Sequence, residues 1–309
     1  FPVVLLLPFL NKAYHIDDTL FLRVAEQVHR NPLHPYRMDY NWGGVHETFW
    51  NATQNPPLGG YLIAAVSLVT GFVEWPMHVF FGAIAVGCSG LMFVLARRFC
   101  RHPGLAAAGA VLTPAFLVSA CNVMADVPLL FFWLLAVWAA VRYAETSHGG
   151  AIWLCGIAAS AAAMTKYFGA ALVPLLAVYC LSAPRGRRWH AVALLLPLVT
   201  LAAWGVYAQR ECGLFHPLSA ARFSVAAKSH IGNGQLRAIA YTLTFLGGGM
   251  VWPLALVLAP AFAAKKVVSA VIQYSVLALV IVLLTLFEYY SPASAAEAAP
   301  LAPMWVFIG

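Results

Sequence analysis

Long apolar runs alternate with short polar gaps along almost the whole chain. A transmembrane helix needs roughly 20 apolar residues to cross a bilayer. Runs that reach or approach this length lie at 76–96, 104–120, 127–143, 151–165, 168–183, 189–207, 238–262 and 267–287. The pattern therefore predicts an all-α transmembrane helix bundle with about ten membrane segments once both ends of the chain are included.

One further run, 57–73, is shorter and follows two prolines. We expect it to lie along the membrane interface, which places all of 11–75 in one outer loop with interfacial helices. If it spanned the membrane instead, 11–56 would lie on the opposite side. The chain begins in the apolar run Phe1–Leu10 and closes in Leu301–Gly309, so we expect a single transmembrane domain, 1–309, truncated at both ends.

Composition agrees with a membrane protein: 62% of the residues are hydrophobic and 9% are charged. Soluble domains carry about 25% charged residues, so a soluble globular fold is excluded. The net charge of +7 would suggest nucleic acid as a partner of a soluble protein. In a membrane protein the position of the basic residues is more informative, and we expect no nucleic acid partner.

Charge alternates from one short gap to the next. Four alternate gaps hold nine Lys/Arg residues and one acid, Glu145. The basic residues are Arg97, Arg98, Arg101, Arg142, Arg185, Arg187, Arg188, Lys265 and Lys266. Under the positive-inside rule these gaps are cytoplasmic. The interleaved gaps, which contain Asp126, Lys166 and Glu288, are then on the outer face.

The outer segment 208–237 departs from this rule. It carries four basic residues against the single acid Glu211: Arg210, Arg222, Lys228 and Arg237. A translocated loop tolerates some positive charge, which is one interpretation. The other is that Arg222 and Lys228 bind an anionic ligand such as a lipid phosphate.

Two adjacent carboxylates, Asp17 and Asp18, follow the first apolar run. An amphipathic helix is predicted directly after them, with Thr19 or Asp18 as its N-cap. Capping accounts for one acid and leaves the other as a candidate for chemistry.

Asp126 and Lys166 are the other ionisable groups at the outer edge of apolar runs. Asp126 starts a strongly apolar helix, where an acid is also favoured by the helix dipole. Lys166 is the one cation between two apolar runs, where it either extends to the interface or pairs with a phosphate or an aspartate.

Metal and nucleotide motifs are missing from the sequence. The ten histidines show no HExxH spacing, and the six cysteines form no CxxC pair. There is no P-loop, no GxGxxG and no GxSxG motif. We therefore predict neither a metal site nor a disulfide framework.

Four local sequences, in this order, resemble the GT-C superfamily of polyprenyl-phosphate-sugar glycosyltransferases, and glycosyltransferase family 39 within it. That family includes protein O-mannosyltransferases and aminoarabinose transferases. The four are Ile16-Asp17-Asp18-Thr19, Asn55-Pro56-Pro57-Leu58-Gly59, Asp126 through Phe132, and Thr165-Lys166-Tyr167. They resemble the family's acidic pair, its His-Pro-Pro-Leu motif, its Asp-x-x-Leu-Leu-Phe-Phe helix start and its Thr-Lys-Gly turn. The likeness covers about 11–185.

The resemblance implies transfer of a sugar from a polyprenyl phosphate to a hydroxyl acceptor in a protein, lipid or glycan, with inversion. It assigns the general base to Asp17, with Asp18 in support, and substrate contacts to Asp126 and Asn55. Lys166 would bind the phosphate, and charge alone adds Arg222 and Lys228. No cofactor is required, although some relatives use a divalent cation.

This chain departs from the family pattern at three positions: Asn55 replaces His or Lys, Tyr167 replaces Gly, and Asp18 replaces the commoner Glu. These departures leave the identities of donor and acceptor open.

Two other functions fit the same pattern. A transporter or lipid flippase would explain the buried charge, although no repeated broken helices are visible. A non-catalytic subunit that binds a lipid-linked substrate would not need the Asp17 carboxylate. The Ala-rich composition, with Arg preferred over Lys, favours a bacterial inner membrane, with the active site facing the periplasm.

Overall fold

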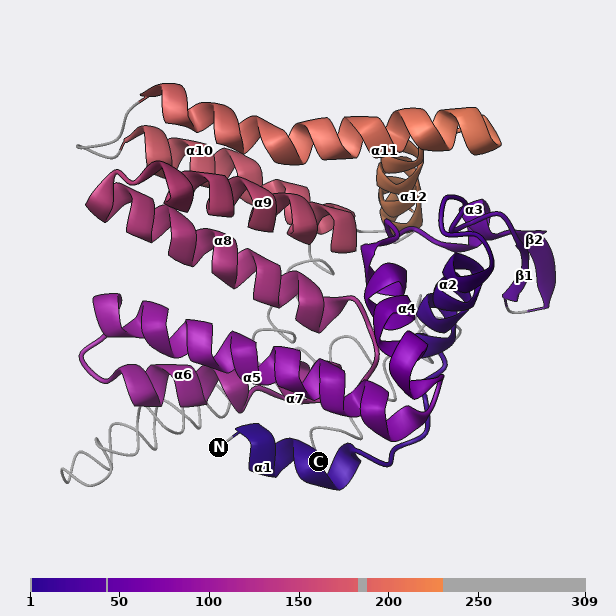
Figure 1. Cartoon of the computed structure of the whole chain (residues 1–309), viewed down its shortest axis with the longest axis horizontal. Helices are drawn as coiled ribbons and strands as arrows, with labels where there is room; N and C mark the ends of the chain where they lie inside the picture. Colours follow the sequence, from indigo (N-terminus) through magenta and orange to yellow (C-terminus); the bar gives the residue numbers. More distant parts are fainter. Residues whose placement is uncertain (1, 43, 183–187, 230–309) are drawn as a thin grey trace, which may run out of the picture. The chain divides into compact units, whose positions relative to one another are not determined.

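The computed structural model describes residues 2–42, 44–182 and 188–229. Its elements are almost all helical (Figure 1). The first half of the described chain contains α1 (Pro2–Leu6), η1 (Leu7–Phe9), α2 (Asp18–Arg30), β1 (Asp39–Trp42), β2 (Val45–Thr48), α3 (Phe49–Ala52), α4 (Leu58–Thr70) and α5 (Glu74–Phe99). The second half contains α6 (Pro103–Val111), α7 (Pro114–Ala120), α8 (Asp126–Thr146), α9 (Gly149–Thr165), η2 (Tyr167–Ala171), α10 (Leu172–Leu181), η3 (Arg188–Leu195), α11 (Leu196–Cys212) and α12 (His216–Ser229).

The chain divides into two compact units. The first comprises Phe1–Pro103 and Phe116–Ala227, and all of the candidate site residues with described side chains belong to it. The second comprises Gly104–Ala115 and Lys228–Gly309, most of which lies outside the described residues.

Within the described residues, three helical segments are long and apolar enough to cross a membrane: Glu74–Phe99, Asp126–Thr146 and Val192–Cys212. Leu58–Thr70, Gly149–Thr165 and Tyr167–Leu181 are apolar but shorter. These helices establish the predicted all-α membrane bundle. The predicted runs 238–262 and 267–287 and the final run 301–309 lie outside the described residues.

The predicted helix over 104–120 is wrong as a single element. The structure forms α6 and α7 there, separated at Leu112 and Thr113 just before Pro114. Proline has no N–H for the helical ladder and disfavours helical geometry in the preceding residue, so the run breaks at this point.

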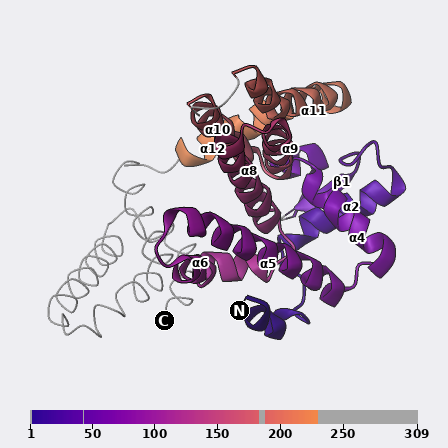
Figure 2. The same ribbon diagram turned by 60° about the vertical axis from the view of Figure 1, so that its left-hand side comes forward.

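Small side chains let α8 and α9 pack closely as an antiparallel pair. Ala136, Ala139 and Ala140 of α8 are buried in one cluster with Cys155 and Ala159 of α9. Short side chains allow close backbone approach, which is how apolar helices pack without a hydrophobic driving force in lipid. Figures 1 and 2 show α10 and α11 beside this pair.

The charged ends of these helices separate into two groups. Arg98 at the end of α5 forms an ion pair with Glu145 at the end of α8. At the opposite end of α8, Asp126 forms an ion pair with Lys166, which directly follows α9. Arg98 and Arg142, which the charge pattern predicts to be cytoplasmic, thus lie at one end of the bundle, and Asp126 and Lys166, which it predicts to be outside, lie at the other.

The loop 11–75 forms a layer of its own at the Asp126 end. Helix α2 is the amphipathic helix that the sequence predicts, and its buried residues include Val24 and Val28. It packs on α4, where a side chain at Gly60 would lie only 2.2 Å from Val24. At 13 residues, α4 is shorter than the roughly 20 needed to cross a bilayer, in agreement with a helix that does not span.

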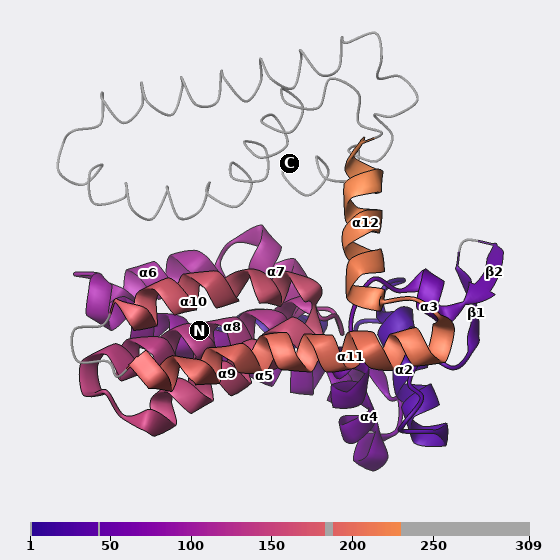
Figure 3. The ribbon, with the colours of Figure 1, turned by 90° about the horizontal axis from the view of Figure 1, so that it is seen from above.

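A β-hairpin, which the sequence reading did not predict, interrupts this helical layer. Strands β1 and β2 pair antiparallel, with Tyr40 opposite Glu47. Two glycines connect them, and Gly44 has a φ of +88°. A two-residue Gly-Gly connection is typical of tight hairpin turns because glycine adopts positive φ without strain. Figure 3 shows the hairpin beyond α2 and α3, while α12 leaves the end of α11 crosswise.

Candidate active site

The Asp17-Asp18 pair forms the start of α2, but the two carboxylates are in different environments. Asp17 occupies the cap position of the helix without a side-chain capping bond, and Asp18 is the first helical residue. The prediction that Thr19 or Asp18 is the N-cap is therefore wrong, because both residues lie inside the helix. Instead, the Asp18 carboxylate accepts a hydrogen bond at 2.8 Å from the main-chain N–H of His15, upstream of the helix.

Asp18 is fully buried, with 0% of its surface exposed. Its other oxygen accepts a hydrogen bond at 3.0 Å from the main-chain N–H of Val123. Burial raises the pKa of Asp18, and the N–H bonds from His15 and Val123 and the nearby charge of Lys12 counteract part of that rise. These contacts give Asp18 a structural role, because it joins the start of α2 to the segment that precedes α8.

Asp17, in contrast, has a side chain that is 43% exposed. The ring of His15 lies beside it, with Nδ1 3.7 Å from the carboxylate. In the part of the chain that the structure describes, no group donates a hydrogen bond to the Asp17 carboxylate. This carboxylate is open to a ligand, whereas that of Asp18 is not.

Lys12 is a cation of this site that the sequence reading missed. Its ammonium group donates a hydrogen bond to the side-chain oxygen of Asn122, the residue before Val123. The partner is a neutral amide, and in the described residues Lys12 forms no ion pair with a carboxylate. Lys12 follows the first apolar run, and this position is the sequence feature that could have indicated a role in the site. Nothing in the sequence predicted that it lies near 121–126.

Lys166 and Asp126 form the ion pair that was one of the two expectations for this lysine. The Lys166 ammonium lies 2.8 Å from an Asp126 oxygen, and both side chains are 37% exposed. The antiparallel packing of α8 and α9 explains the pairing, since the start of one helix meets the end of the other. Asp126 follows Val123 by three residues, so this pair lies close to the Asp18 contact.

The other predicted residues are more peripheral. The main chain of Asn55 accepts a hydrogen bond from the Tyr36 hydroxyl at 2.7 Å, and its half-buried side chain has no polar partner among the described residues. Arg222 lies exposed on α12. Lys228 is near the end of α12, and its side chain lies outside the described part of the structure.

A buried hydrogen-bond network surrounds Tyr167, the residue that replaces the family's glycine. The Tyr167 hydroxyl lies 2.5 Å from Nδ1 of His216 and accepts a hydrogen bond at 2.8 Å from the Trp204 indole. His216 Nε2 contacts the carbonyl oxygens of Trp50 and Thr53 at 3.2 and 3.1 Å. Carbonyl oxygens only accept, so Nε2 donates and Nδ1 accepts from Tyr167. The network holds the turn after Lys166 against the outer loop and the start of α12.

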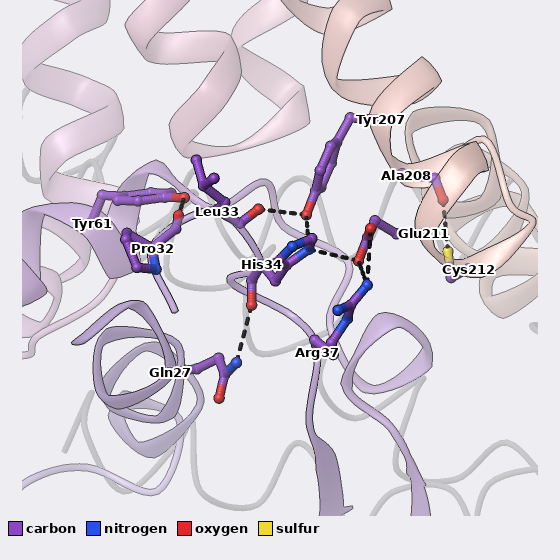
Figure 4. Close-up of polar contacts among 10 residues, drawn as sticks. All are labelled: Gln27, Pro32, Leu33, His34, Arg37, Tyr61, Tyr207, Ala208, Glu211 and Cys212. Atoms are coloured by element: carbon purple, nitrogen blue, oxygen red, sulfur yellow. Dashed lines mark hydrogen bonds and ion pairs between the residues drawn. The ribbon is translucent and has the colours of Figure 1, made fainter. Parts of the chain in front are cut away.

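Figure 4 shows the contacts of Glu211, the single acid of the basic segment 208–237. Its carboxylate binds His34 Nδ1 at 2.9 Å and Arg37 at 3.1 Å. The Tyr207 hydroxyl donates to the Leu33 carbonyl at 2.6 Å. The end of α11 is therefore joined to the loop after α2, and the segments predicted to share the outer face are in contact.

No group of three His, Cys, Asp or Glu side chains that could hold a metal ion occurs among the described residues. The site thus consists of an open carboxylate at Asp17, a buried one at Asp18, and two lysines near the segment 121–126. Such an arrangement can accept a proton and stabilise an anion.

Comparison with known proteins identifies the family. The family model described as dolichyl-phosphate-mannose-protein mannosyltransferase matches residues 54–207, a range that begins after α3 and ends within α11. Searches of curated proteins and of solved structures returned no significant match. The matched region contains Asp126 and Lys166 but begins after Asp17 and Asp18. On this match, the chain belongs to a GT-C type family of membrane glycosyltransferases.

Proposed function

We propose that this protein transfers a sugar from a polyprenyl-phosphate donor to a hydroxyl acceptor, with inversion at the anomeric carbon. Asp17 is the general base, and the reaction takes place at the end of the bundle where Asp126 and Lys166 meet. Membership of a glycosyltransferase family supports the reaction class. The donor, the stereochemistry and the base are our proposal.

The observation that carries this proposal is the contrast between the two aspartates. The Asp18 carboxylate is buried and accepts two main-chain N–H groups, so it is engaged in holding the chain. The Asp17 carboxylate is 43% exposed beside it and accepts no hydrogen bond from the described residues. A general base needs a free lone pair within reach of the acceptor proton, and Asp17 satisfies this requirement.

In the proposed step, the acceptor hydroxyl loses its proton to Asp17 as its oxygen bonds to the anomeric carbon. The bond from that carbon to the phosphate oxygen breaks, and its electron pair leaves on the polyprenyl phosphate. Attack from the face opposite the leaving group inverts the anomeric carbon. Base catalysis of this kind contributes about 10²- to 10⁴-fold.

The leaving phosphate needs cations rather than an acid, because its negative charge grows as the bond breaks. Lys12 is suited to this role because its hydrogen-bond partner, Asn122, is neutral. Lys166 is part of an ion pair and would share its charge between Asp126 and the donor. Arg222 and Lys228 remain candidates from the charge of their segment. The polyprenyl tail would lie along the apolar bundle.

The site is proposed to face the periplasm of a bacterial inner membrane. Arg98 and Arg142 lie at the end of the bundle opposite Asp126, and the positive-inside rule assigns such an end to the cytoplasm. The acceptor and donor sugar would then meet outside the cytoplasm, where no nucleotide sugar is needed.

The test is a transfer assay on the full-length protein in membrane vesicles of known orientation. Radiolabelled polyprenyl-phosphate sugars would be supplied from one side, and the anomeric configuration of the product determined by NMR. The proposal expects label to leave the donor only when the periplasmic face is accessible, with an inverted product. A retained configuration, or transfer only from the cytoplasmic face, would contradict it.

A further inference from the structure

His216 is a buried histidine that the proposed reaction does not use. It is the first residue of α12, and only 1% of its surface is exposed. Its ring lies among the aromatic rings of Tyr36, Trp50, Tyr167 and Trp204, at centroid distances of 5.5 to 6.4 Å. Burial of a polar ring costs free energy unless its nitrogens are hydrogen-bonded, so the partners of both nitrogens show what this residue holds together.

The two ring nitrogens of His216 bind two segments that are far apart in the sequence. Nδ1 accepts a hydrogen bond from the Tyr167 hydroxyl at 2.5 Å. Nε2 donates to the carbonyl oxygens of Trp50 and Thr53 at 3.2 and 3.1 Å. With Tyr167 as the donor, these contacts require the neutral ring with its proton on Nε2. Burial lowers the pKa of His216, which favours the neutral ring at neutral pH.

Each of these two segments contains a residue assigned to the substrate. Tyr167 directly follows Lys166, and Thr53 precedes Asn55 by two residues. The main-chain N–H of Asn55 donates to the Thr53 hydroxyl at 3.2 Å, so these two residues are also joined by a direct contact. His216 therefore connects the turn that carries Lys166 to the loop that carries Asn55.

The third segment is α12 itself, whose start is fixed at the same point. A side chain at Gly205 of α11 would lie 2.3 Å from the ring of Phe215, so the residue before His216 packs directly against α11. Figure 3 shows α12 leaving the end of α11 crosswise. Arg222 follows His216 by six residues, roughly 9 Å along the helix. Three segments with candidate contacts to the substrate therefore meet at one imidazole ring.

The turn at Lys166 shows how this network can act on the site. The Lys166 N–H donates to the Ala162 carbonyl at 3.1 Å, and the Lys166 carbonyl accepts from the Gly169 N–H at 2.8 Å. The Lys166 side chain reaches Asp126 of α8, whereas the Tyr167 side chain reaches α11 and α12. Because the turn is held by its own main-chain bonds, the anchor at Tyr167 determines where the Lys166 ammonium lies relative to α12.

We infer that His216 is a positioning residue, which holds the turn of Lys166, the segment 50–55 and α12 in one arrangement around the donor phosphate. This inference rests on the proposed function and adds a residue that acts through other residues rather than through contact with the substrate. Tyr167 supplies the hydroxyl of the link at a position where the family pattern has glycine. Groups that are already in place bind a ligand more tightly, because the ligand does not have to order them.

The first test measures equilibrium binding of polyprenyl phosphate, without a sugar, to the full-length protein in detergent. Tyr167→Phe removes only the hydroxyl and should raise the Kd at least about fivefold, an effect typical of one lost hydrogen bond. Partial unfolding lowers the number of binding sites but leaves their Kd unchanged, so the Kd separates positioning from a purely structural role.

The matched control is Tyr207→Phe. It removes a hydroxyl that donates to the Leu33 carbonyl at 2.6 Å and ties α11 to the same outer loop, but outside the His216 network. This variant should bind polyprenyl phosphate as the wild type does. An unchanged Kd in Tyr167→Phe, or an equal rise in both variants, would overturn the positioning role.

The second test compares two substitutions of His216 in the transfer assay, with the concentration of polyprenyl-phosphate sugar varied. His216→Phe keeps a ring but lacks both nitrogens, and it should raise the KM for the donor at least about tenfold. His216→Gln keeps one hydrogen-bond donor group and one acceptor, so it should recover much of that loss. A variant that is only unstable would lower Vmax and leave this KM unchanged. Equal KM values for the wild type and His216→Phe, or equal rises in the two variants, would contradict the inference.

The two assays separate failure of this inference from failure of the proposed function. If all variants bind polyprenyl phosphate and transfer sugar as the wild type does, the positioning role is wrong and the glycosyltransferase proposal stands. If the wild type transfers label from no donor, yet Tyr167→Phe weakens the binding of polyprenyl phosphate, the proposed function fails and the positioning role at a phosphate site stands.

Discussion

The Asp18 carboxylate accepts the main-chain N–H of Val123, a residue 105 positions further along the chain, at 3.0 Å. With the second bond from His15, this contact fixes the turn that presents Asp17 against the segment leading into α8. The paired acids of the sequence thus have separate roles: one holds the site together, and its neighbour is left open at the surface of the site.

Removal of the Asp18 carboxylate should therefore destabilise the fold. Asp18→Ala leaves the buried N–H of Val123 and the partly buried N–H of His15 without acceptors, which costs about 2 to 5 kcal/mol in the free energy of unfolding. Asp17→Ala, at a half-exposed position, should change stability by less than about 0.5 kcal/mol. Thermal unfolding of the purified protein in detergent, followed by tryptophan fluorescence, compares the two. Equal stability of both variants would contradict the structural role of Asp18.

His216 should make the fold sensitive to acid. Burial lowers the pKa of His216 below its ordinary value of 6.5. The unfolded chain therefore binds a proton more readily than the folded one, so stability is present above pH 6.5 and is lost as the pH falls through the lowered pKa. Melting temperatures measured from pH 8 to pH 5 should fall more steeply for the wild type than for His216→Phe. Parallel profiles would show that His216 does not titrate in this range.

If Lys166 binds the donor phosphate, substitution of Lys166 and substitution of Asp126 should have different effects on the KM for the donor. Lys166→Met removes the cation and should raise KM for the polyprenyl-phosphate sugar about tenfold, the equivalent of roughly 1.4 kcal/mol. Asp126→Asn removes the competing carboxylate and should leave that KM unchanged or lower. Steady-state kinetics with varied donor measures both. An equal rise in KM for the two variants would indicate that the pair only holds α8 and α9 together.

Lys12 provides an independent test of phosphate binding. Because its partner Asn122 is neutral, the Lys12 charge is available to the donor. Lys12→Met should raise the donor KM about tenfold, and Lys12→Arg should restore much of the loss, since a charge-assisted hydrogen bond contributes about 1.5 to 3 kcal/mol. Asn122→Ala is the companion variant, with a smaller effect expected. No change in the donor KM of Lys12→Met would remove it from the site.

Hydropathy and charge predicted the architecture because both depend on local sequence. The long apolar runs became α5, α8, α9 and α11, and among the described residues the charged pairs Arg98–Glu145 and Lys166–Asp126 lie at opposite ends of the bundle. Pro114 indicates a break between α6 and α7, but the apolar length of 104–120 favoured the prediction of a single helix. The hairpin was missed because its strands, at four residues each, are too short to show an alternating pattern.

The site was only partly predictable. Four charged residues stand out beside apolar runs: Asp17, Asp18, Asp126 and Lys166. The structure places Asp18 and Lys166 in contact with the segment 121–126, which contains Asp126. Partners that depend on distant contacts could not be read from the sequence. Lys12 meets Asn122 across 110 positions, and Tyr167 meets His216 across 49, without any shared local motif. Which of the two adjacent aspartates is buried depends on Val123, so the sequence alone could not separate their roles.

The role of Asp17 as general base can be tested by replacing its carboxylate with an amide. Glycosyl transfer from a labelled polyprenyl-phosphate sugar would be compared in wild type and Asp17→Asn, with full-length protein in membranes at matched expression. We expect Asp17→Asn to lower kcat by at least about 10²-fold, the usual contribution of a general base, while the protein stays folded. Transfer by Asp17→Asn at the wild-type rate would contradict it.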